Sequence, residues 1–393
     1  MSKFGSHITI GPRNLFGAAL QQCANAHSPV PLIFALDQNV WDDVVKYSPS
    51  TFIIFRTQPD GHDNPPGIYS GDPIVVAEEW YAACKPKWLL NKARWYAPLN
   101  EANPAMIAMR QALAQAKARG VEISQADRVR MMADAIKTPM TANQHQWLDR
   151  FLLEMIELAY ADDLYLAVPG CSTGTPEPND WTYYAASLQA LKETGGILIV
   201  HEYGLHYGTL QASAPHGLAL RYRSYHQVIE GMGIHDLPMA ITEASADAGY
   251  FGQGTAWLDD AIWYDGELMQ NPYVIGFCAY QLGGAENWQS LIPQWADYVA
   301  THPTPDVPPP SDEWVFDRYE LEDGTVIQRG NPALDFDLTS DRHIIAVYEK
   351  KAPPVETFTF QLSVRPAECA PRVSASPAPG EYPQGTFISV RAT

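Results

Sequence analysis

Two glutamates, each at the end of a short apolar run, are the residues of this sequence best suited to do chemistry. Glu101 closes the run WYAPLNE at residues 95–101, and Glu243 closes PMAITE at residues 238–243. Both runs have the length and composition of buried strands. A carboxylate at the carboxyl end of a parallel strand is where an eight-stranded barrel keeps its reactive groups. Two such carboxylates, on different strands, are what cleavage of a glycosidic bond requires.

Short apolar runs alternate with helical patterns along residues 1–300, which predicts a (β/α)8 TIM barrel. Eight runs are predicted as strands: 4–10, 31–36, 51–56, 94–99, 164–168, 196–201, 238–242 and 273–280. Helices are predicted at 15–26, 40–46, 74–84, 104–119, 126–136, 144–160, 181–193, 219–231, 257–269 and 291–300. In this order Glu101 ends the fourth strand and Glu243 the seventh. These strands face each other across the mouth of a closed barrel, so the two carboxylates are expected to meet there.

Asn100 and Glu101 at the end of the fourth run, with Glu243 at the end of the seventh, resemble the clan A glycoside hydrolases. These are retaining barrel enzymes, and the resemblance covers roughly residues 4–300. It implies that Glu101 is the acid/base, that Glu243 is the nucleophile, and that Asn100 hydrogen-bonds the sugar 2-hydroxyl. The clan usually has Asn-Glu-Pro, whereas the proline here is Pro104.

The same resemblance implies further substrate-binding residues around the pair. The clan keeps an arginine early in the barrel, and Arg56 ends the third run here. It also keeps a histidine or tyrosine after the sixth strand, where this sequence has His201 and Tyr203. A tryptophan is usual at the eighth strand, but Tyr280 stands there and Trp288 follows further on.

The two glutamates are expected to differ in protonation. If Tyr203 and Arg56 donate hydrogen bonds to Glu243, that carboxylate stays ionised. Its negative charge would then raise the pKa of Glu101 and keep that residue protonated near neutral pH. Glu202 has the opposite pleat parity to Tyr203, so it is expected to point away from the barrel axis.

Each of these residues also has a purely structural interpretation. Either glutamate, or Asn100 or Thr242, could cap the following helix. His201 could be a hydrogen-bonded structural histidine. Arg56 could pair with a neighbouring acid such as Asp37.

The aromatic content suggests a carbohydrate ligand, because sugar rings stack on flat side chains. The sequence has 11 Trp, 20 Tyr and 13 Phe. Near the predicted strand ends, the candidates for stacking on a sugar are Trp288, Tyr207, Tyr250 and Tyr280. Any one of them could instead belong to the core. The partner predicted from these features is an oligo- or polysaccharide.

Composition and motifs argue against several other classes of protein. The net charge of −19 disfavours a nucleic-acid surface. No stretch approaches about 18 apolar residues, so no membrane insertion is expected. The 11 histidines form no metal-binding motif, and no nucleotide-binding fingerprint occurs, so no metal and no cofactor are expected. The five cysteines are scattered, and we expect them to be reduced.

A competing motif lies between the two glutamates in the sequence, and a long loop precedes both of them. GCSTG at residues 170–174 matches a serine-hydrolase nucleophile elbow centred on Ser172. That elbow requires a helix directly after it, and the prolines of TPEP at residues 175–178 forbid one. A serine hydrolase is therefore the less favoured alternative. The long loop 57–73 is predicted to wall the binding cleft.

Beyond residue 300 the pattern changes. Residues 301–313 are predicted to form a proline-rich linker. In residues 314–393 apolar and polar residues alternate as in β-strands, which predicts one or two small β modules. Two segments, 333–348 and 379–393, resemble the closing and opening strands of small bacterial surface-protein repeats, and the end after an opening pattern suggests a truncated repeat. This tail favours a secreted protein or one at a cell or virion surface, although no signal peptide is present. It also supports the rival hypothesis of a non-catalytic carbohydrate-binding or surface protein on a barrel scaffold.

Overall fold

The computed structural model describes two parts of the chain. The described residues are 2–8, 13–36, 41–57, 59–90, 93–246, 256–280, 291–302 and seven strands between residues 314 and 392. The contacts divide the chain into two compact units, Met1–Thr304 and Pro305–Thr393, and each is described by itself. Most of the predicted linker, residues 303–313, lies outside the described residues.

Eight parallel strands form the sheet of the first unit, in the order β4-β3-β2-β1-β8-β7-β6-β5. At the two ends of that order, β4 and β5 meet through a parallel bridge between Tyr96 and Leu166, which closes the sheet into a barrel. The strands are β1 (Phe4–Ile8), β2 (Leu32–Ala35), β3 (Phe52–Arg56), β4 (Trp95–Ala97), β5 (Ala167–Cys171), β6 (Ile197–Tyr203), β7 (Met239–Ser245) and β8 (Val274–Ala279). The predicted (β/α)8 fold is confirmed.

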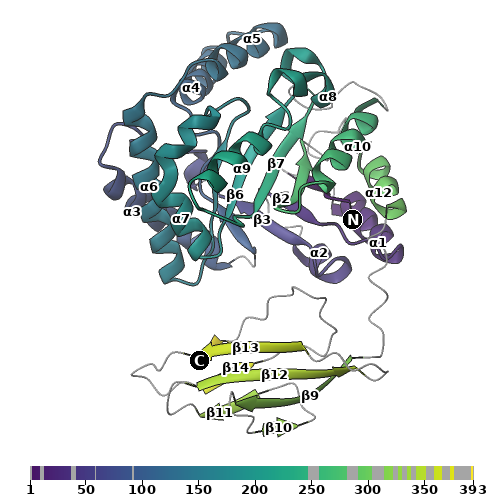
Figure 1. Ribbon diagram of the computed structural model, residues 1–393. Helices are drawn as coiled ribbons and strands as arrows, with labels where there is room; N and C mark the ends of the chain where they lie inside the picture. Colours follow the sequence, from purple (N-terminus) through teal and green to yellow (C-terminus); the bar gives the residue numbers. More distant parts are fainter. Residues whose placement is uncertain are drawn as a thin grey trace. The chain divides into compact units, whose positions relative to one another are not determined.

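Helices surround this barrel (Figure 1). They are α1 (Arg13–Asn25), α2 (Trp41–Tyr47), α3 (Pro73–Leu90), α4 (Pro104–Ala118), α5 (Gln125–Ile136), α6 (Ala142–Ala161), α7 (Ala185–Glu193), α8 (Leu210–Ser213), α9 (Tyr222–Gly231), α10 (Ala256–Met269) and α12 (Leu291–Thr301). The prediction over 181–193 is corrected: the 3₁₀ turn η3 (Pro178–Tyr184) covers its first residues, and α7 follows it. No described helix has the length and apolar character that crossing a membrane requires.

Strand ends near the mouth differ from the predicted ones in a way that bears on the site. β6 and β7 run on to Tyr203 and Ser245, two and three residues past the predicted ends. They pair in parallel with His201 opposite Glu243, so the neighbouring strands place these two residues side by side. β5 begins at Ala167, three residues later than predicted.

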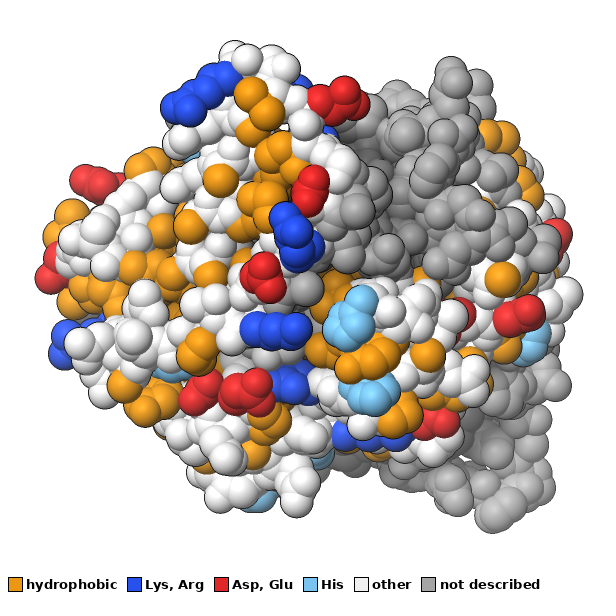
Figure 2. Space-filling model, turned by 90° about the horizontal axis from the view of Figure 1, so that it is seen from above, with side chains coloured by type: hydrophobic (Ala, Val, Ile, Leu, Met, Phe, Trp, Pro, Cys, Tyr) orange, Lys and Arg blue, Asp and Glu red, His pale blue; other side chains and the backbone are white. Residues whose placement is uncertain are grey.

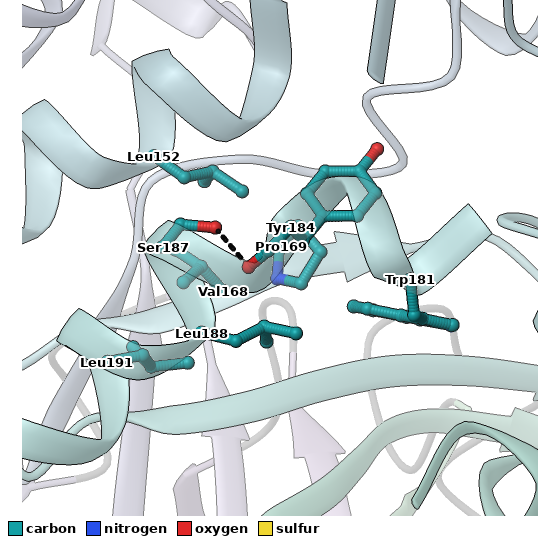
Figure 3. Close-up of a pocket in the computed structure, with 8 residues that line it drawn as sticks. All are labelled: Leu152, Val168, Pro169, Trp181, Tyr184, Ser187, Leu188 and Leu191. Carbon is teal, nitrogen blue, oxygen red and sulfur yellow. Dashed lines mark hydrogen bonds between the residues drawn. The ribbon is translucent and has the colours of Figure 1, made fainter. Parts of the chain in front are cut away.

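Two clusters of buried side chains hold the barrel together. One cluster has only strand residues as its fully buried members, including Phe34, Ile54, Ile199 and Ala240, and it fills the barrel interior. The larger cluster joins the outward faces of the strands to the helices. Between β5, η3, α6 and α7 the packing leaves a cavity of about 10 Å³, lined mainly by apolar side chains (Figure 3). Because a water molecule needs about 10–15 Å³, this cavity is a packing defect rather than a ligand site.

The second unit consists of antiparallel strands. A four-stranded sheet has the order β10-β9-β12-β13, and a three-stranded sheet has the order β11-β14-β15. The strands are β9 (Trp314–Leu321), β10 (Val326–Arg329), β11 (Leu334–Asp337), β12 (Arg342–Lys350), β13 (Phe358–Val364), β14 (Arg372–Ala375) and β15 (Arg391–Ala392). The resemblance to surface-protein repeats stays a prediction.

Candidate active site

Glu101 and Glu243 meet at the C-terminal end of the barrel. One oxygen of each carboxylate and one ring nitrogen of His201 all lie within 4.8 Å of one another. All three side chains are buried. The convergence predicted from the fourth and seventh strands is therefore present in the structure.

Glu243, on β7, is held by donors from three other strands. Arg56 Nη1 donates to Glu243 Oε1 at 2.8 Å, and Tyr203 OH donates to Oε2 at 2.6 Å. His7 Nε2 lies 3.4 Å from Oε1, and His201 Nδ1 lies 3.5 Å from Oε2. Burial raises the pKa of Glu243, but His201, His7 and Arg56 outweigh it and hold that pKa well below its usual value. An ionised Glu243 with Arg56 and Tyr203 as donors was expected from the sequence.

Glu101 lies beyond β4 in a left-handed backbone conformation, with φ of 48°. Its N–H donates to Gly170 O at 2.8 Å, which ties this turn to β5. Arg110 Nη2 binds Glu101 Oε2, and His201 Nδ1 lies 3.3 Å from Oε1. Burial raises the pKa of Glu101, but Arg110 and His201 together lower it by more, so the pKa ends below its usual value. The expectation that Glu243 would keep Glu101 protonated is wrong, because the nearby guanidinium outweighs the second carboxylate.

The loop 57–73 braces the turn that carries Glu101. Asn64 Nδ2 donates to Asn100 O at 2.9 Å, and Asn100 N donates to Asn64 Oδ1 at 3.2 Å. Tyr69 OH donates to Ala102 O. The side-chain Oδ1 of Asn100 is buried and has no hydrogen-bond partner among the described residues. This loop therefore fixes the backbone on both sides of Glu101. The side-chain oxygen Oδ1 of Asn100 stays available to accept a hydrogen bond.

One of the structural interpretations, capping of α4 by Asn100 or Glu101, is wrong. Helix α4 is capped by Asn103, whose side chain accepts from Ala105 N and Met106 N, rather than by Asn100 or Glu101. Arg56 binds Glu243, while Asp37 lies outside the described residues.

The predicted aromatic residues have different outcomes. Tyr280, directly after β8, packs edge-on against His7 and Tyr203, with ring centroids 4.9 Å and 5.8 Å apart. Tyr207 is stacked against His216, with ring centroids 4.0 Å apart. Trp288 and Tyr250 lie outside the described residues. Tyr280 is therefore the predicted aromatic residue that the structure places next to the glutamates.

Three residues of the site were missed by sequence reasoning. His7 is fully buried beside Glu243, and its signal was its place near the carboxyl end of the first apolar run. Arg110 reaches Glu101 from α4, and its Nη1 also binds Asp63 Oδ2 at 3.1 Å. No motif marks Arg110 or Asp63, because their meeting depends on how a helix and a loop are placed.

The same cluster offers three metal-ligand atoms, but its charges do not suit a cation. Glu101, His201 and Glu243 could each supply one ligand atom. Arg56 and Arg110 already occupy an oxygen of each carboxylate, so a divalent ion would lie next to two guanidinium groups. The donor set therefore fits an acid–base pair better than a metal centre.

Ser172, the centre of the elbow-like motif, is not placed as a nucleophile. It is buried, and its Oγ is 2.9 Å from Thr175 Oγ1. Among the described residues, the hydrogen bonds of Ser172 include none to a histidine. A serine hydrolase gains no support from this geometry.

The C-terminal end of the barrel carries side chains of both charges. Helices α4 and α8, which follow β4 and β6, lie at the top of Figure 1, so Figure 2 shows this end from above. Acidic and basic side chains alternate there, with no large patch of a single sign among the described residues.

No family model matches this sequence, and no curated protein is similar to it. A triple mutant of an endo-β-1,4-glucanase from Xanthomonas axonopodis pv. citri has a TM-score of 0.42 at 10% identity, covering 77% of this chain and 100% of its own. The tri-modular endo-β-1,4-glucanase B of Bacillus halodurans has a TM-score of 0.44 at 10% identity, covering 92% of this chain and 78% of its own.

The endo-1,4-β-D-mannanase of Thermotoga petrophila RKU-1 has a TM-score of 0.36 at 11% identity, covering 76% of this chain and 100% of its own. All three similar structures are glycoside hydrolases. Likenesses of this size carry no argument for a shared activity, so the function has to be inferred from the site itself.

Proposed function

We propose that this protein is a retaining glycoside hydrolase that cleaves β-linked glycans by double displacement. The observation that carries the proposal is the pair of buried carboxylates, with oxygens of Glu101 and Glu243 within 4.8 Å. Retaining enzymes hold their two carboxyl groups about 5–5.5 Å apart, whereas inverting enzymes need about 6.5–9.5 Å to admit a water molecule. The separation here is on the retaining side.

The two glutamates take different roles in this reaction. Glu243 is ionised and firmly oriented, so it attacks the anomeric carbon and forms a glycosyl-enzyme. Glu101 delivers a proton to the leaving oxygen and then removes one from the water that hydrolyses the intermediate. The Oδ1 of Asn100, which has no hydrogen-bond partner among the described residues, accepts a hydrogen bond from a sugar hydroxyl.

A panel of polysaccharides (mannan, xylan, glucans and galactan), scored by released reducing ends, tests this activity. Glu243→Gln is expected to abolish turnover, because the amide cannot attack. Glu101→Gln is expected to abolish turnover of polysaccharides but to retain the first step on aryl glycosides whose leaving group needs no proton. Glu202→Gln is the matched control, since Glu202 neighbours His201 in sequence but contacts the helices outside the barrel.

A mechanism-based epoxide or fluoro-sugar identifies the nucleophile. Covalent labelling of Glu243, followed by peptide mass spectrometry, is the expected result. Wild-type activity in Glu243→Gln, or a label on another residue, would contradict the assignment. Binding of a polysaccharide without turnover or labelling would instead support the non-catalytic carbohydrate-binding alternative.

A further inference from the structure

Both oxygens of Glu101 are occupied in this structure. Arg110 Nη2 binds Oε2, and His201 Nδ1 lies 3.3 Å from Oε1. A general acid has to bring a protonated oxygen within about 2.6–3.2 Å of the leaving group. Oε2 cannot do so while the guanidinium of Arg110 is bound to it. The observed pairing therefore differs from the arrangement that proton transfer needs.

Arg110 has a second acidic partner that does not belong to the reacting pair. Its Nη1 binds Asp63 Oδ2 at 3.1 Å and lies 3.4 Å from Asn100 O. Asp63 lies on the loop after β3 and Arg110 lies on α4, so the contact joins two elements that line the mouth. The Arg110 side chain is 31% exposed, so it can move toward solvent. Arg110 can thus leave Glu101 and remain paired.

The arginine on the other carboxylate lacks this freedom. The Arg56 side chain is 8% exposed, and Glu243 is its ion-pair partner among the described residues. If Arg56 left Glu243, its buried charge would have no other carboxylate partner among the described residues, which is strongly unfavourable. The two arginines therefore have different capacities for movement, although each binds one glutamate.

We propose that Arg110 is a latch that can release Glu101 while it stays paired with Asp63. Bound to Glu101, it covers the proposed acid/base and keeps it ionised. Bound to Asp63 alone, it frees Glu101 to take up a proton and face the leaving group. Entry of the leaving-group part of a glycan beside Glu101 displaces the latch. The inference rests on the proposed function, and Arg110 acts in it as a positioning residue through Glu101.

Several groups other than Arg110 act on the protonation of Glu101. The titratable or charged groups that face it are Arg110 of α4, His201 and Tyr203 of β6, Glu243 of β7, Cys171 of β5 and Tyr280 after β8. After burial, which raises the pKa of Glu101, the charge of Arg110 is the largest influence, and it lowers that pKa. Loss of the Arg110 charge therefore favours the protonated form of Glu101.

Two substitutions are expected to act in opposite directions. Arg110→Gln removes the positive charge, so the basic limb of the kcat/KM profile moves to higher pH. Asp63→Asn removes the alternative partner and leaves Arg110 on Glu101, so the basic limb moves to lower pH. At pH 8, kcat/KM on a polysaccharide should rise at least about threefold in the first variant and fall at least about threefold in the second.

A dinitrophenyl glycoside separates this effect from general damage to the site. Its leaving group needs no proton, so neither substitution should change the rate of the glycosylation step more than about twofold. Arg119→Gln, an exposed arginine at the end of the same helix, is the matched control and should retain the wild-type profile. Shifts in the same direction for both variants, or equal losses on both substrates, would overturn the latch.

A titration that needs no turnover distinguishes failure of the latch from failure of the proposed reaction. The protein is labelled with ¹³C-glutamate and titrated by NMR, with Glu101→Gln to assign the carboxyl signal of Glu101. The pH midpoint of that signal should rise in Arg110→Gln and fall in Asp63→Asn. Unchanged midpoints in both variants would overturn the latch even if glycans are cleaved. Shifted midpoints without hydrolysis of any polysaccharide would leave the electrostatic exchange standing and remove the proposed reaction.

Discussion

Glu202 offers a test of the fold that is independent of the reaction. It alternates with His201 and Tyr203 along β6 and points away from the barrel interior, as its parity predicted. Its carboxylate accepts hydrogen bonds from Leu220 N at 2.6 Å and Tyr222 N at 2.9 Å, at the start of α9, and from the hydroxyl of Tyr264. The side chain is 1% exposed. Burial outweighs these hydrogen bonds and raises the pKa of Glu202 to about 7.

The raised pKa fixes the sign of a pH effect on stability. A glutamate with a pKa of about 7 in the folded state and 4.5 in the unfolded state binds more protons when folded. Its contribution is therefore fully present below the unfolded pKa and is lost as the pH rises through the folded pKa. At about 1.36 kcal/mol per pKa unit, the free energy of unfolding should fall by about 2 to 3 kcal/mol between pH 5 and pH 8 through this residue.

Glu202→Gln removes this titration while keeping one acceptor for the start of α9. Urea unfolding of both proteins, followed by tryptophan fluorescence at pH 5, 6, 7 and 8, gives the difference in unfolding free energy at each pH. Any constant cost of the amide cancels in the change of that difference with pH. We expect the unfolding free energy of the wild type to fall by about 2 to 3 kcal/mol relative to that of Glu202→Gln over this range. A difference that stays flat from pH 5 to pH 8 would refute the reasoning.

Two further substitutions test the ion pair between Arg56 and Glu243 and the backbone packing at the end of β6. Arg56→Gln removes a cation that lowers the pKa of Glu243, so the acidic limb of kcat/KM should move to higher pH; a pH profile with an aryl glycoside measures this, and an unchanged limb would contradict it. Gly204 directly follows β6, and a Cβ there would lie 2.1 Å from Ala246 O and 2.5 Å from Thr209 O. Because backbone atoms must shift, Gly204→Ala should lower the free energy of unfolding by about 2 kcal/mol or more. Urea unfolding checks this, and wild-type stability would show that the strand end yields easily.

The part of the site that the sequence predicted follows from topology and parity. Eight alternating units fix the order of the strands, and this order brings the ends of the fourth and seventh together, where Glu101 and Glu243 stand. The family resemblance pointed to His201 and Tyr203 on β6, and parity turned Glu202 outward. These inferences need no side-chain coordinates, because strand order and a period of two determine which faces meet.

The remaining features depend on contacts between elements whose placement no local pattern encodes. Arg110 and Asp63 meet only because α4 and the loop after β3 approach the same turn. The φ of 48° at Glu101 is uncommon for a residue with a side chain, and the turn is held by the hydrogen bond to Gly170 O and by Asn64 on its other side. The expected pKa shift of Glu101 had the wrong direction because the sequence does not reveal that the guanidinium of Arg110 lies against this carboxylate.

The two glutamates differ in the contacts that hold their carboxylates, and this difference can be compared with the roles proposed for them. A nucleophile keeps the same protonation state until it reacts, so fixed and buried donors such as Arg56 and Tyr203 suit Glu243. An acid/base residue gains and loses a proton in each turnover, and a permanent cation on its oxygen would oppose the first of these steps. An arginine that is partly exposed and has Asp63 as a second partner satisfies both demands, because it stabilises the ligand-free carboxylate and can be displaced. The asymmetry of the two arginines therefore supports the proposed assignment of roles independently of the separation of the carboxylates.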